Sequence, residues 1–496
     1  MSTIHVTQLV IETRSPMAIN SGSRETGFDT QLARDVNGLP YIPATAIAGV
    51  WSHVIQSAPC AASDKEKSLA LRDKWLGTTE QSSSLSISNG RVLNSKNQAV
   101  LPLTPIAEIE QDAVLNLLSQ QRPHHRERVA INDRGVARET GKFDQILLPK
   151  GVRFSITLRW SDRGRGDNAT LHKDEWQELL SLWHDPAFAF GSSTRNGLGK
   201  IKVIACEQHE IDLSQGQSAA ARLRQALNTQ ARVTSENRLP EPGKSSSLRL
   251  IAELPLQALD NWRCGSGSEL LGKNRPENAV ALITYSEPRF EWKKNVASLK
   301  KNKAVLCGSS IKGMIAHRVA YHWRKHKEIW AETMAESGHD DWQQRPGELT
   351  ALFGLASENH EDSRAGRLYI DDCDIDYEHT VIRHHNSVDR FTGGVRKGAL
   401  FSEELLYRPR FTIKLWLRRD AQLSSELEAA LADTLNDLKL GLLPMGAGSG
   451  RGTSLVMPCA NPEGNSEGNS EDNSKSNKKW LVQLPSQTTN NGDAIA

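Results

Sequence analysis

Hydrophobic and polar positions alternate with the period of β-strands at matching places in both halves of the chain. The alternation predicts strands at 4–12, 152–160, 248–254 and 411–417, and shorter strands at 85–92, 198–204, 367–371 and 453–457. Helical spacing of apolar residues predicts helices beginning near 45 and 309 and covering 173–183 and 424–439. Each half therefore shows the order βαββαβ.

The second half also repeats the motifs of the first half in the same order. PATAIAG at 43–49 resembles CGSSIKG at 307–313, RVAINDR at 128–134 resembles HNSVDR at 385–390, and GSSTRNGLGK at 191–200 resembles GAGSGRGTS at 446–454. Chance similarity of short motifs would not preserve that order. We predict an α+β chain of two tandem RRM-like or ferredoxin-like (βαββαβ) domains, 1–205 and 247–458.

The remaining segments have the composition of connecting chain. Residues 206–246 are rich in Gln, Ala, Ser and Pro and predict a linker. The tail, 459–496, contains NPEGNSEGNSEDNSKSNKK, a low-complexity run that predicts disorder.

The composition of the chain excludes several classes of protein. The 61 Lys and Arg residues nearly cancel the 59 Asp and Glu residues, so a basic binding surface has to be local. Six cysteines occur without a CxxC pair, which excludes a dense disulfide framework and a cysteine-rich zinc module and fits a reducing cytoplasm. No apolar run approaches the ~20 residues that span a bilayer, and the first residues lack a signal-peptide pattern. We expect neither a membrane protein nor a secreted one.

Basic residues gather in three segments. Residues 122–142 hold six basic and three acidic residues, 383–397 hold four basic residues and one acid, and 293–303 hold five lysines and no acid. Interleaved His and Phe residues would suit a nucleic-acid backbone with rings available for stacking. A solvated charged hairpin is the alternative for any one run, but three runs favour nucleic-acid binding.

The glycine-rich segments precede strands and lack the spacing of nucleotide-binding loops. Backbone N–H groups freed by several glycines could still cradle a phosphate, with charge from Arg195, Lys200 and Arg451. A tight turn between helix and strand is the other interpretation.

The small-residue turns that precede the first helix of each half could hold an anion or simply cap the helix. Lys312 adds charge in the second copy only. His322 and His326, spaced i and i+4, are a weak metal candidate because the sequence shows no carboxylate partner for them.

Together these motifs resemble the RAMP superfamily, in particular the backbone subunits (the Cas-seven group) of type III CRISPR effector complexes. LPYIPATAIAG at 39–49 is similar to the family's LPYIPGSSLKG, and 128–154 and 386–401 are similar to its RxxIDRxTGxAxxGxLF pattern. The two-copy chain resembles the fused backbone subunits of III-D-like variants. The resemblance covers about 1–205 and 247–458.

The resemblance implies modified RRM domains with thumb hairpins, at about 122–148 and 380–402, that interrupt a guide–target duplex at intervals. It implies the guide CRISPR RNA, target single-stranded RNA and other type III Cas subunits as partners. The latter comprise a large polymerase- or cyclase-like subunit and other backbone and small subunits. The RNA-binding residues that we predict are Thr45, Arg126, Arg128, Arg134, Arg195, Lys200, Ser309, Ser310, Lys312, Arg383, Arg390, Arg396 and Arg451.

In catalytic members of this family an aspartate precedes the LPYIP turn and is needed for cleavage of target RNA. The resemblance assigns that role to Asp29, with Asp35 as the fallback, and implies a divalent metal, Mg²⁺ or Mn²⁺, whose ligands are unknown. No aspartate lies between Gly267 and Cys307, so we expect the second domain to bind guide and target but to cut poorly or not at all.

Other functions stay open at this point. If Asp29 is a solvated loop carboxylate, the chain is a non-catalytic scaffold for guide and target. A nuclease of the same superfamily that processes CRISPR RNA is a third interpretation. His53 is available near the first helix for that role but has no companion base.

Overall fold

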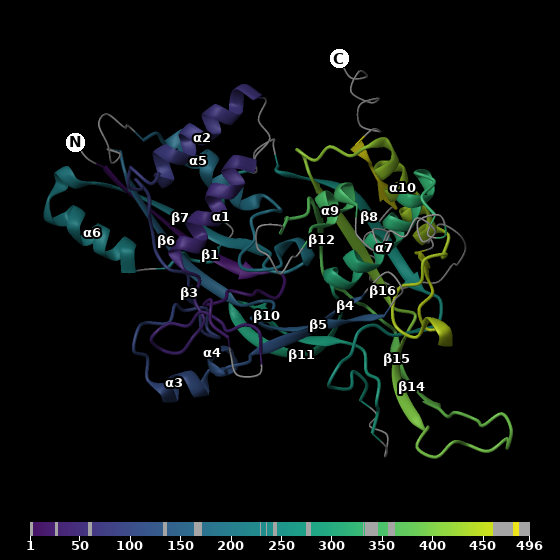
Figure 1. Cartoon of the computed structure of the whole chain (residues 1–496). Coiled ribbons are helices and arrows are strands. Elements are labelled where there is room, and N and C mark those ends of the chain that lie inside the picture. Colours follow the sequence, from purple (N-terminus) through teal and green to yellow (C-terminus); the bar gives the residue numbers. More distant parts are fainter. Residues whose placement is uncertain are drawn as a thin grey trace, which may run out of the picture. The chain divides into compact units, whose positions relative to one another are not determined.

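The chain folds into two compact units in the computed structural model (Figure 1). Unit 1 consists of Met1–Thr194, Leu198–Arg249 and Pro288–Lys301, and unit 2 of Arg195–Gly197, Leu250–Glu287 and Asn302–Ala496. Two short segments thus pack with the half to which they do not belong in sequence. The structure describes residues 3–24, 28–57, 62–131, 136–162, 171–228, 230–234, 236–241, 246–273, 279–330, 332, 346–355, 363–459 and 480–485.

An antiparallel sheet organises unit 1. Its central strand β1 (Thr3–Thr13) pairs with β6 (Arg153–Ser161) on one side and β7 (Ile201–Asp212) on the other. β6 also pairs with the short strands β2 (Ser86–Ile87) and β3 (Arg91–Val92), into which the predicted strand 85–92 divides. The helices of this unit are α1 (Ala44–Ser57), α2 (Ala62–Leu76), α3 (Ile106–Gln111), α4 (Ala113–Ser119), α5 (Lys173–Ser181) and α6 (Gln217–Asn228).

A cluster of tryptophan rings fills the space between this sheet and its helices. Trp51 of α1 lies with its ring centroid 5.8 Å from that of Trp176 on α5 and 5.4 Å from that of Trp183. Trp75 of α2 stacks on Trp176 at 5.4 Å and meets Trp160 of β6 edge-on at 5.1 Å. Because each large ring removes much apolar surface from water, this cluster anchors α1, α2 and α5 to the sheet.

The predicted linker is partly a structured element of unit 1. β7 continues to Asp212 and stays paired with β1 along its whole length. The following α6 buries Ala219 and Ala226 against Val6 and Ile211. The linker prediction is wrong for these residues, because the two alanines, with Leu223 and Leu227 packed beside them, form the apolar face of an amphipathic helix.

Unit 2 is built around a sheet with the corresponding strand order. Its central strand β8 (Leu248–Ala258) pairs antiparallel with β17 (Val456–Pro458) and lies next to β16 (Arg410–Arg418), which also pairs with β12 (Leu368–Ile370). The helices are α7 (Gly308–His326), α9 (Gly347–Phe353) and α10 (Ser425–Lys439). Both units therefore confirm the predicted α+β class with antiparallel sheets.

The C-terminal tail contributes to the sheet of unit 2. β18 (Leu481–Val482) pairs with β8, Leu481 opposite Glu253 and Val482 opposite Ala252. Leu484 is buried in the core of the unit. The expectation of a disordered tail is wrong for residues 480–485, because this segment pairs with β8 and buries Leu484 in the core. The low-complexity run before them lies outside the described residues.

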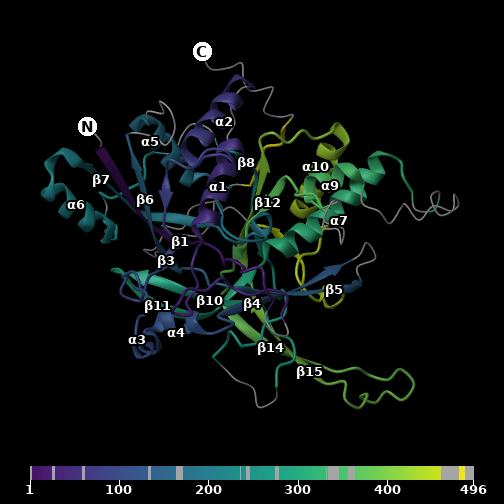
Figure 2. The same ribbon diagram turned by 60° about the vertical axis from the view of Figure 1, so that its left-hand side comes forward.

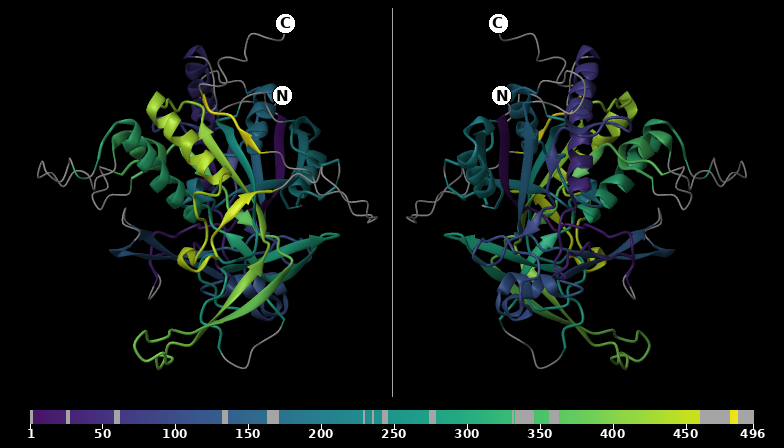
Figure 3. Two further views of the ribbon diagram at one scale, coloured as in Figure 1. Left: turned by 90° about the vertical axis from the view of Figure 1, so that its right-hand side faces the viewer. Right: turned by 90° about the vertical axis from the view of Figure 1, so that its left-hand side faces the viewer.

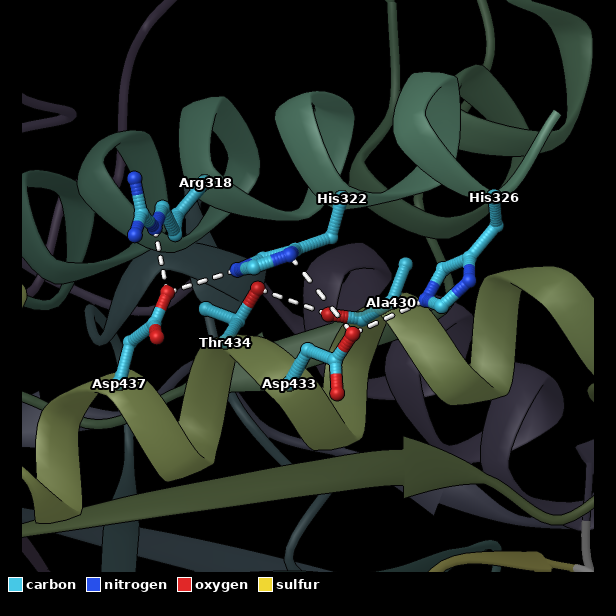
Figure 4. A network of polar contacts seen from close by, with 7 residues as sticks. All are labelled: Arg318, His322, His326, Ala430, Asp433, Thr434 and Asp437. Carbon is cyan, nitrogen blue, oxygen red and sulfur yellow. Dashed lines mark hydrogen bonds and ion pairs between the residues drawn. The ribbon is translucent and has the colours of Figure 1, made fainter. Parts of the chain in front are cut away.

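A polar network joins α7 to α10 (Figure 4). His322 Nε2 lies 2.6 Å from Asp437 Oδ2, and Arg318 Nε lies 2.5 Å from the same oxygen. His326 Nε2 lies 2.9 Å from Asp433 Oδ2. The carboxylate partners that the sequence did not reveal thus come from α10, and the histidines link two helices. Within the described ranges, no group of three or more His, Cys, Asp or Glu side chains is arranged to hold a metal.

We expect Asp437→Asn to destabilise unit 2 by about 1–3 kcal/mol at neutral pH. Burial of the Asp437 carboxyl opposes its ionisation, but the hydrogen bonds from His322 and Arg318 outweigh this effect and lower its pKa. A lowered pKa stabilises the fold above the unfolded-state pKa of about 4, and this contribution disappears as the pH falls through the folded-state value. Urea unfolding at several pH values should therefore show the difference between wild type and variant shrinking below about pH 4.

Candidate nucleic-acid interface

The first basic segment forms a β-hairpin in unit 1. β4 (His124–Ile131) pairs antiparallel with β5 (Ala137–Leu147), so that Arg126 lies opposite Gln145 and Glu127 opposite Asp144. Arg126 is only 1% exposed and belongs to the base of the hairpin. Farther along, exposed apolar side chains of Val129, Ile131, Val136 and Phe143 accompany the charges.

Side chains at the base of this hairpin hold the first glycine-rich loop. Arg128 Nη1 donates to the hydroxyl of Ser193 at 3.3 Å, and the Gln145 amide donates to the hydroxyl of Ser192. Ser193 has φ of 58°, so the loop turns sharply at this contact. Hairpin and loop are separate binding candidates in the sequence, and the structure brings their side chains into contact.

Asp29 lies at the same hairpin. Its Oδ2 accepts a hydrogen bond from the backbone N–H of Asp144 at 3.0 Å, and the neighbouring Thr30 hydroxyl accepts one from Ile146 N–H at 2.9 Å. Asp29 is exposed, and within the described part of the chain nothing hydrogen-bonds its Oδ1. One carboxylate oxygen therefore fixes the loop on β5 while the other faces solvent.

A cation and two rings adjoin this aspartate. The guanidinium of Arg122 lies 4.2 Å from the centroid of the Phe28 ring, and Phe28 meets His125 edge-on at 5.7 Å. Phe28 directly precedes Asp29, and Arg122 and His125 are both exposed. The carboxylate is thus surrounded by groups suited to a phosphate and a base.

The residue whose backbone binds Asp29 carries a second carboxylate. Asp144, whose N–H bonds to Asp29, has its own Oδ1 buried without a hydrogen-bond partner among the described residues. An ionised oxygen buried in this way is costly unless a cation or donor reaches it. Mg²⁺ is often held by only one or two carboxylates together with substrate phosphates, and the unpartnered Asp144 Oδ1 is an oxygen of the type that binds such an ion.

Asp35, the fallback for catalysis, serves the fold of the loop instead. Its Oδ1 accepts the N–H groups of Asn37 and Leu39, both at 2.9 Å, and its own N–H donates to the Leu39 carbonyl at 2.8 Å. These bonds close the turn that leads into LPYIP. The aspartate suits this position because its short side chain accepts from two backbone N–H groups of the turn, those of residues 37 and 39.

The second basic segment forms a long hairpin in unit 2. β14 (His379–His385) pairs with β15 (Phe401–Tyr407), which also pairs with β9 (Asn261–Trp262). The loop between β14 and β15 reaches far beyond the paired strands (Figures 2 and 3). Its exposed side chains include Val388, Arg390, Phe391, Val395, Arg396 and Lys397, and Phe391 is 100% exposed.

A turn built on Asp389 organises this loop. Asp389 Oδ1 accepts the N–H groups of Phe391 and Thr392, each at 2.9 Å, and these bonds lower the pKa of the Asp389 carboxyl. The turn displays Phe391 and Arg390 side by side in sequence, one apolar and one cationic. The loop therefore combines a solvent-exposed ring with several positive charges.

A buried glutamate collects basic groups at the base of this second hairpin. Glu403 is 0% exposed, and its Oε1 accepts a hydrogen bond from His385 Nε2 at 2.6 Å. Its Oε2 lies 3.6 Å from Arg263 Nε and 3.8 Å from Arg451 Nη2. Arg451 belongs to the second glycine-rich loop, so hairpin and loop meet in unit 2 as well. Arg383, another predicted RNA-binding residue, lies directly opposite Glu403 in the pairing of β14 with β15.

The first helix of each unit is capped by a side chain from another segment. Ala44 N–H donates to Asn89 Oδ1 at 2.9 Å, and Gly308 N–H donates to Asp372 Oδ1 at 2.8 Å. The first N–H of α1 and of α7 is therefore already satisfied, which favours capping over anion binding. Lys312 is 8% exposed, so a predicted RNA contact through its side chain does not agree with its burial.

The remaining predicted residues fall into different surroundings. Thr45 and Ser310 are exposed in the first turns of their helices, and Ser309 and Lys200 are half-buried. Arg195 packs with unit 2, where its guanidinium lies 5.3 Å from the Tyr369 ring. Next to it, Gly197 has φ of 98°, and a Cβ there would lie 2.4 Å from Asp372 Oδ1. Arg134 lies outside the described residues.

Sequence reasoning missed Phe28, Asp144 and Glu403. Phe28 had a signal, because an aromatic residue directly before the candidate aspartate could have been included in the site. Glu403 also had one, since FSEELLY places two acids within an apolar strand and buried acids require partners. Nothing in the sequence singled out Asp144, because its role depends on the pairing of two distant segments.

The sequence model of the RAMP superfamily matches residues 10–202 and 256–456. The two matched regions together cover well over half of the chain, so the chain belongs to the RAMP superfamily, in two tandem copies. Membership of this family indicates a CRISPR-associated RNA-binding subunit. No curated protein sequence matches the chain. No helix in the described ranges has the length and apolar character needed to cross a bilayer.

Replacing Asp35 separates its structural role from a chemical one. We expect Asp35→Ala to speed amide hydrogen exchange at Asn37 and Leu39 by about tenfold or more, because both donors lose their acceptor. Asp35→Asn keeps a side-chain oxygen and should leave exchange close to wild type. Equal exchange in all three proteins would contradict the capping role.

Proposed function

We propose that this chain is a backbone subunit of a type III CRISPR ribonucleoprotein, which holds guide RNA against target RNA and cleaves the target at unit 1. The observation that carries the proposal is the position of Asp29. It is an exposed carboxylate that the backbone of β5 orients, beside a basic hairpin that contacts the first glycine-rich loop.

The two hairpins support the part of the proposal that concerns RNA. Each combines exposed apolar side chains with basic residues, Phe143 with Arg128 in one and Phe391 with Arg390 in the other. Rings without an apolar partner can stack on bases of any sequence, and the charges can bind the backbone. In the proposed complex the hairpins act as thumbs that interrupt the guide–target duplex, and other type III Cas subunits flank the chain.

Cleavage in this proposal is attack of a target 2′-hydroxyl oxygen on the adjacent phosphorus, which breaks the P–O5′ bond. The products are a 2′,3′-cyclic phosphate and a 5′-hydroxyl, whose oxygen takes its proton from water. Asp29 Oδ1 faces solvent and can orient that hydroxyl or accept its proton, while Arg122 can bind a phosphate oxygen. A divalent ion, Mg²⁺ or Mn²⁺, would be held by Asp29 and Asp144 and would stabilise charge on the phosphate. Phe28 can support a displaced base beside the cleavage point.

Unit 2 supports binding without this cleavage reaction. The segment that corresponds to the Asp29 loop has no aspartate between Gly267 and Cys307. Its buried acids already have partners, since Glu404 accepts the N–H groups of Leu271 and Gly272 and Glu403 accepts from His385. A scaffold without any cleavage is the second candidate, because Asp29 also has a structural bond to β5.

We expect Asp29→Ala to lower target cleavage by about 100-fold or more in the assembled complex, because the hydroxyl loses the carboxylate that orients it. Asp144→Asn should lower cleavage less, by about tenfold, and raise the Mg²⁺ concentration for half-maximal rate. Cleavage is measured on labelled target RNA, with guide content as a control for assembly and Asp35→Asn as the matched variant. If Asp29→Ala gives as much product as wild type, Asp29 is not the catalyst and the non-catalytic scaffold becomes the better description.

Cutting of CRISPR repeat RNA by the purified chain alone would instead favour the processing nuclease.

We expect Phe391→Ala to weaken target binding by about 1–3 kcal/mol without changing stability, because the ring is wholly exposed and has only stacking to lose. Binding is measured by titration of target RNA on the guide-loaded complex. Val395→Ala, on the same loop, is the control and should change binding less. Equal losses in the two variants would speak against a stacking role.

A further inference from the structure

A third hairpin, contributed by the second half of the sequence, packs into unit 1. It consists of β10 (Ser286–Lys293) and β11 (Val296–Leu306). Its backbone contacts the rest of unit 1 where Phe290 N–H donates to the Lys150 carbonyl at 2.8 Å. Gly151 has φ of 88°, and a Cβ there would lie 2.1 Å from the Phe290 carbonyl oxygen. Only a glycine lets the two backbones approach so closely.

Side chains fix the same hairpin on its inner face. Trp292 Nε1 donates to the Gly151 carbonyl at 2.8 Å, and the Arg153 guanidinium lies 3.9 Å above the Trp292 ring. Ala297 N–H donates to the Ser95 carbonyl at 2.8 Å, and the side chains of Phe290 and Ala297 belong to the core of unit 1. The end of the hairpin is therefore held rigidly on unit 1.

The rest of the hairpin is rich in positive charge, and Glu291 of β10 lies on the same strand face as Lys293. Lys293, Lys294, Lys300 and Lys301 are exposed, and no acid occurs between Trp292 and Lys303. None of these four lysines has an ion-pair partner among the described residues. Lys294 and Asn295 have φ of 48° and 60°, so a tight turn joins β10, which ends at Lys293, to β11, which carries Lys300 and Lys301.

This charge is a local excess, because the whole chain, these lysines included, has a formal net charge of only +2. Some lysines of unit 1 are instead paired with acids, as in Lys74–Glu175 and Lys173–Glu210. Four like charges on a rigid support repel one another, and binding of a polyanion removes that repulsion and releases counterions. Lysines on a strand edge also prevent association of sheets, which is the alternative to be tested.

We propose that this lysine ribbon, defined as Lys293, Lys294, Lys300 and Lys301, binds the sugar–phosphate backbone of single-stranded RNA as an additional site of unit 1. The inference rests on the proposed RNA-binding function and adds a site that the second half of the sequence supplies to the first unit. Because lysine ammonium groups act as point charges, the site reads phosphates and is independent of base sequence.

The test compares two triple variants of the full chain. Lys293→Gln, Lys300→Gln and Lys301→Gln together remove ribbon charge and leave Lys294, whose positive φ shapes the turn. The matched control replaces three exposed helix lysines, Lys67, Lys325 and Lys439, by Gln. Affinity for a mixed-sequence single-stranded RNA of about 30 nucleotides is measured between about 50 and 200 mM salt, with thermal unfolding as a check of folding.

We expect the ribbon variant to bind about tenfold or more weakly near 0.1 M salt, with the slope of log K against log salt reduced by about 2, since each phosphate contact contributes ~0.7. The control should keep the wild-type slope. Lysine acetylation of the RNA-bound protein should show protection of the ribbon lysines relative to Lys67.

Several outcomes overturn the inference. If wild type and ribbon variant bind RNA with equal slope, the ribbon does not contact phosphate, and the proposed function stands. If the ribbon variant aggregates while its remaining monomer binds normally, the lysines only protect a strand edge. If wild type itself binds no RNA, the proposed function fails together with the inference. Trp292→Ala, which loosens the support but keeps every lysine, should lower affinity while leaving the slope nearly unchanged.

Discussion

The arrangement of both candidate RNA-binding faces depends on polar contacts at the base of each projecting hairpin. A two-stranded ribbon is only marginally stable by itself, so its direction is set by what holds its base. In unit 1 Arg128 and Gln145 bind two serine hydroxyls of the glycine-rich loop, and Asp29 accepts the Asp144 N–H. In unit 2 Glu403 holds His385 with Arg263 and Arg451 nearby. In unit 1, hairpin, loop and aspartate therefore lie together, and in unit 2 hairpin and loop do.

The two copies reach the same arrangement by different chemistry. Neutral hydroxyl acceptors join hairpin and loop in unit 1, whereas unit 2 uses a fully buried carboxylate with basic partners. A buried carboxylate is tolerated only with such basic partners, whereas a serine hydroxyl such as that of Ser193 does not need a charged partner. Burial lowers the pKa of Arg263, and the nearby Glu403 opposes that shift. Duplication thus conserved the layout of the site while its contacts and the Asp29 carboxylate diverged.

Much of the architecture could be predicted from local patterns. Apolar strand patterns located β1, β6, β8 and β16, of which β16 alternates in burial while β1 is buried along most of its length. The ordered motif pairs revealed the duplication. The linker and tail predictions were wrong where composition misled. Ala219 and Ala226 of α6 and Leu484 after β18 are few apolar residues in polar surroundings, and their burial depends on a surface that other segments provide.

The sequence by itself determined the kinds of groups available: two basic hairpins, two glycine-rich loops, one candidate aspartate in the first half and none in the matching loop of the second. Tertiary structure decided which groups meet. Asp35 closes a turn, Asp144 joins Asp29, Lys312 is buried, and a hairpin from the second half packs on Gly151 of the first. Local pattern reports the preference of each segment for strand, helix or turn. Contacts between segments more than a hundred positions apart depend on how buried surfaces and unsatisfied polar groups find partners once the whole chain has folded.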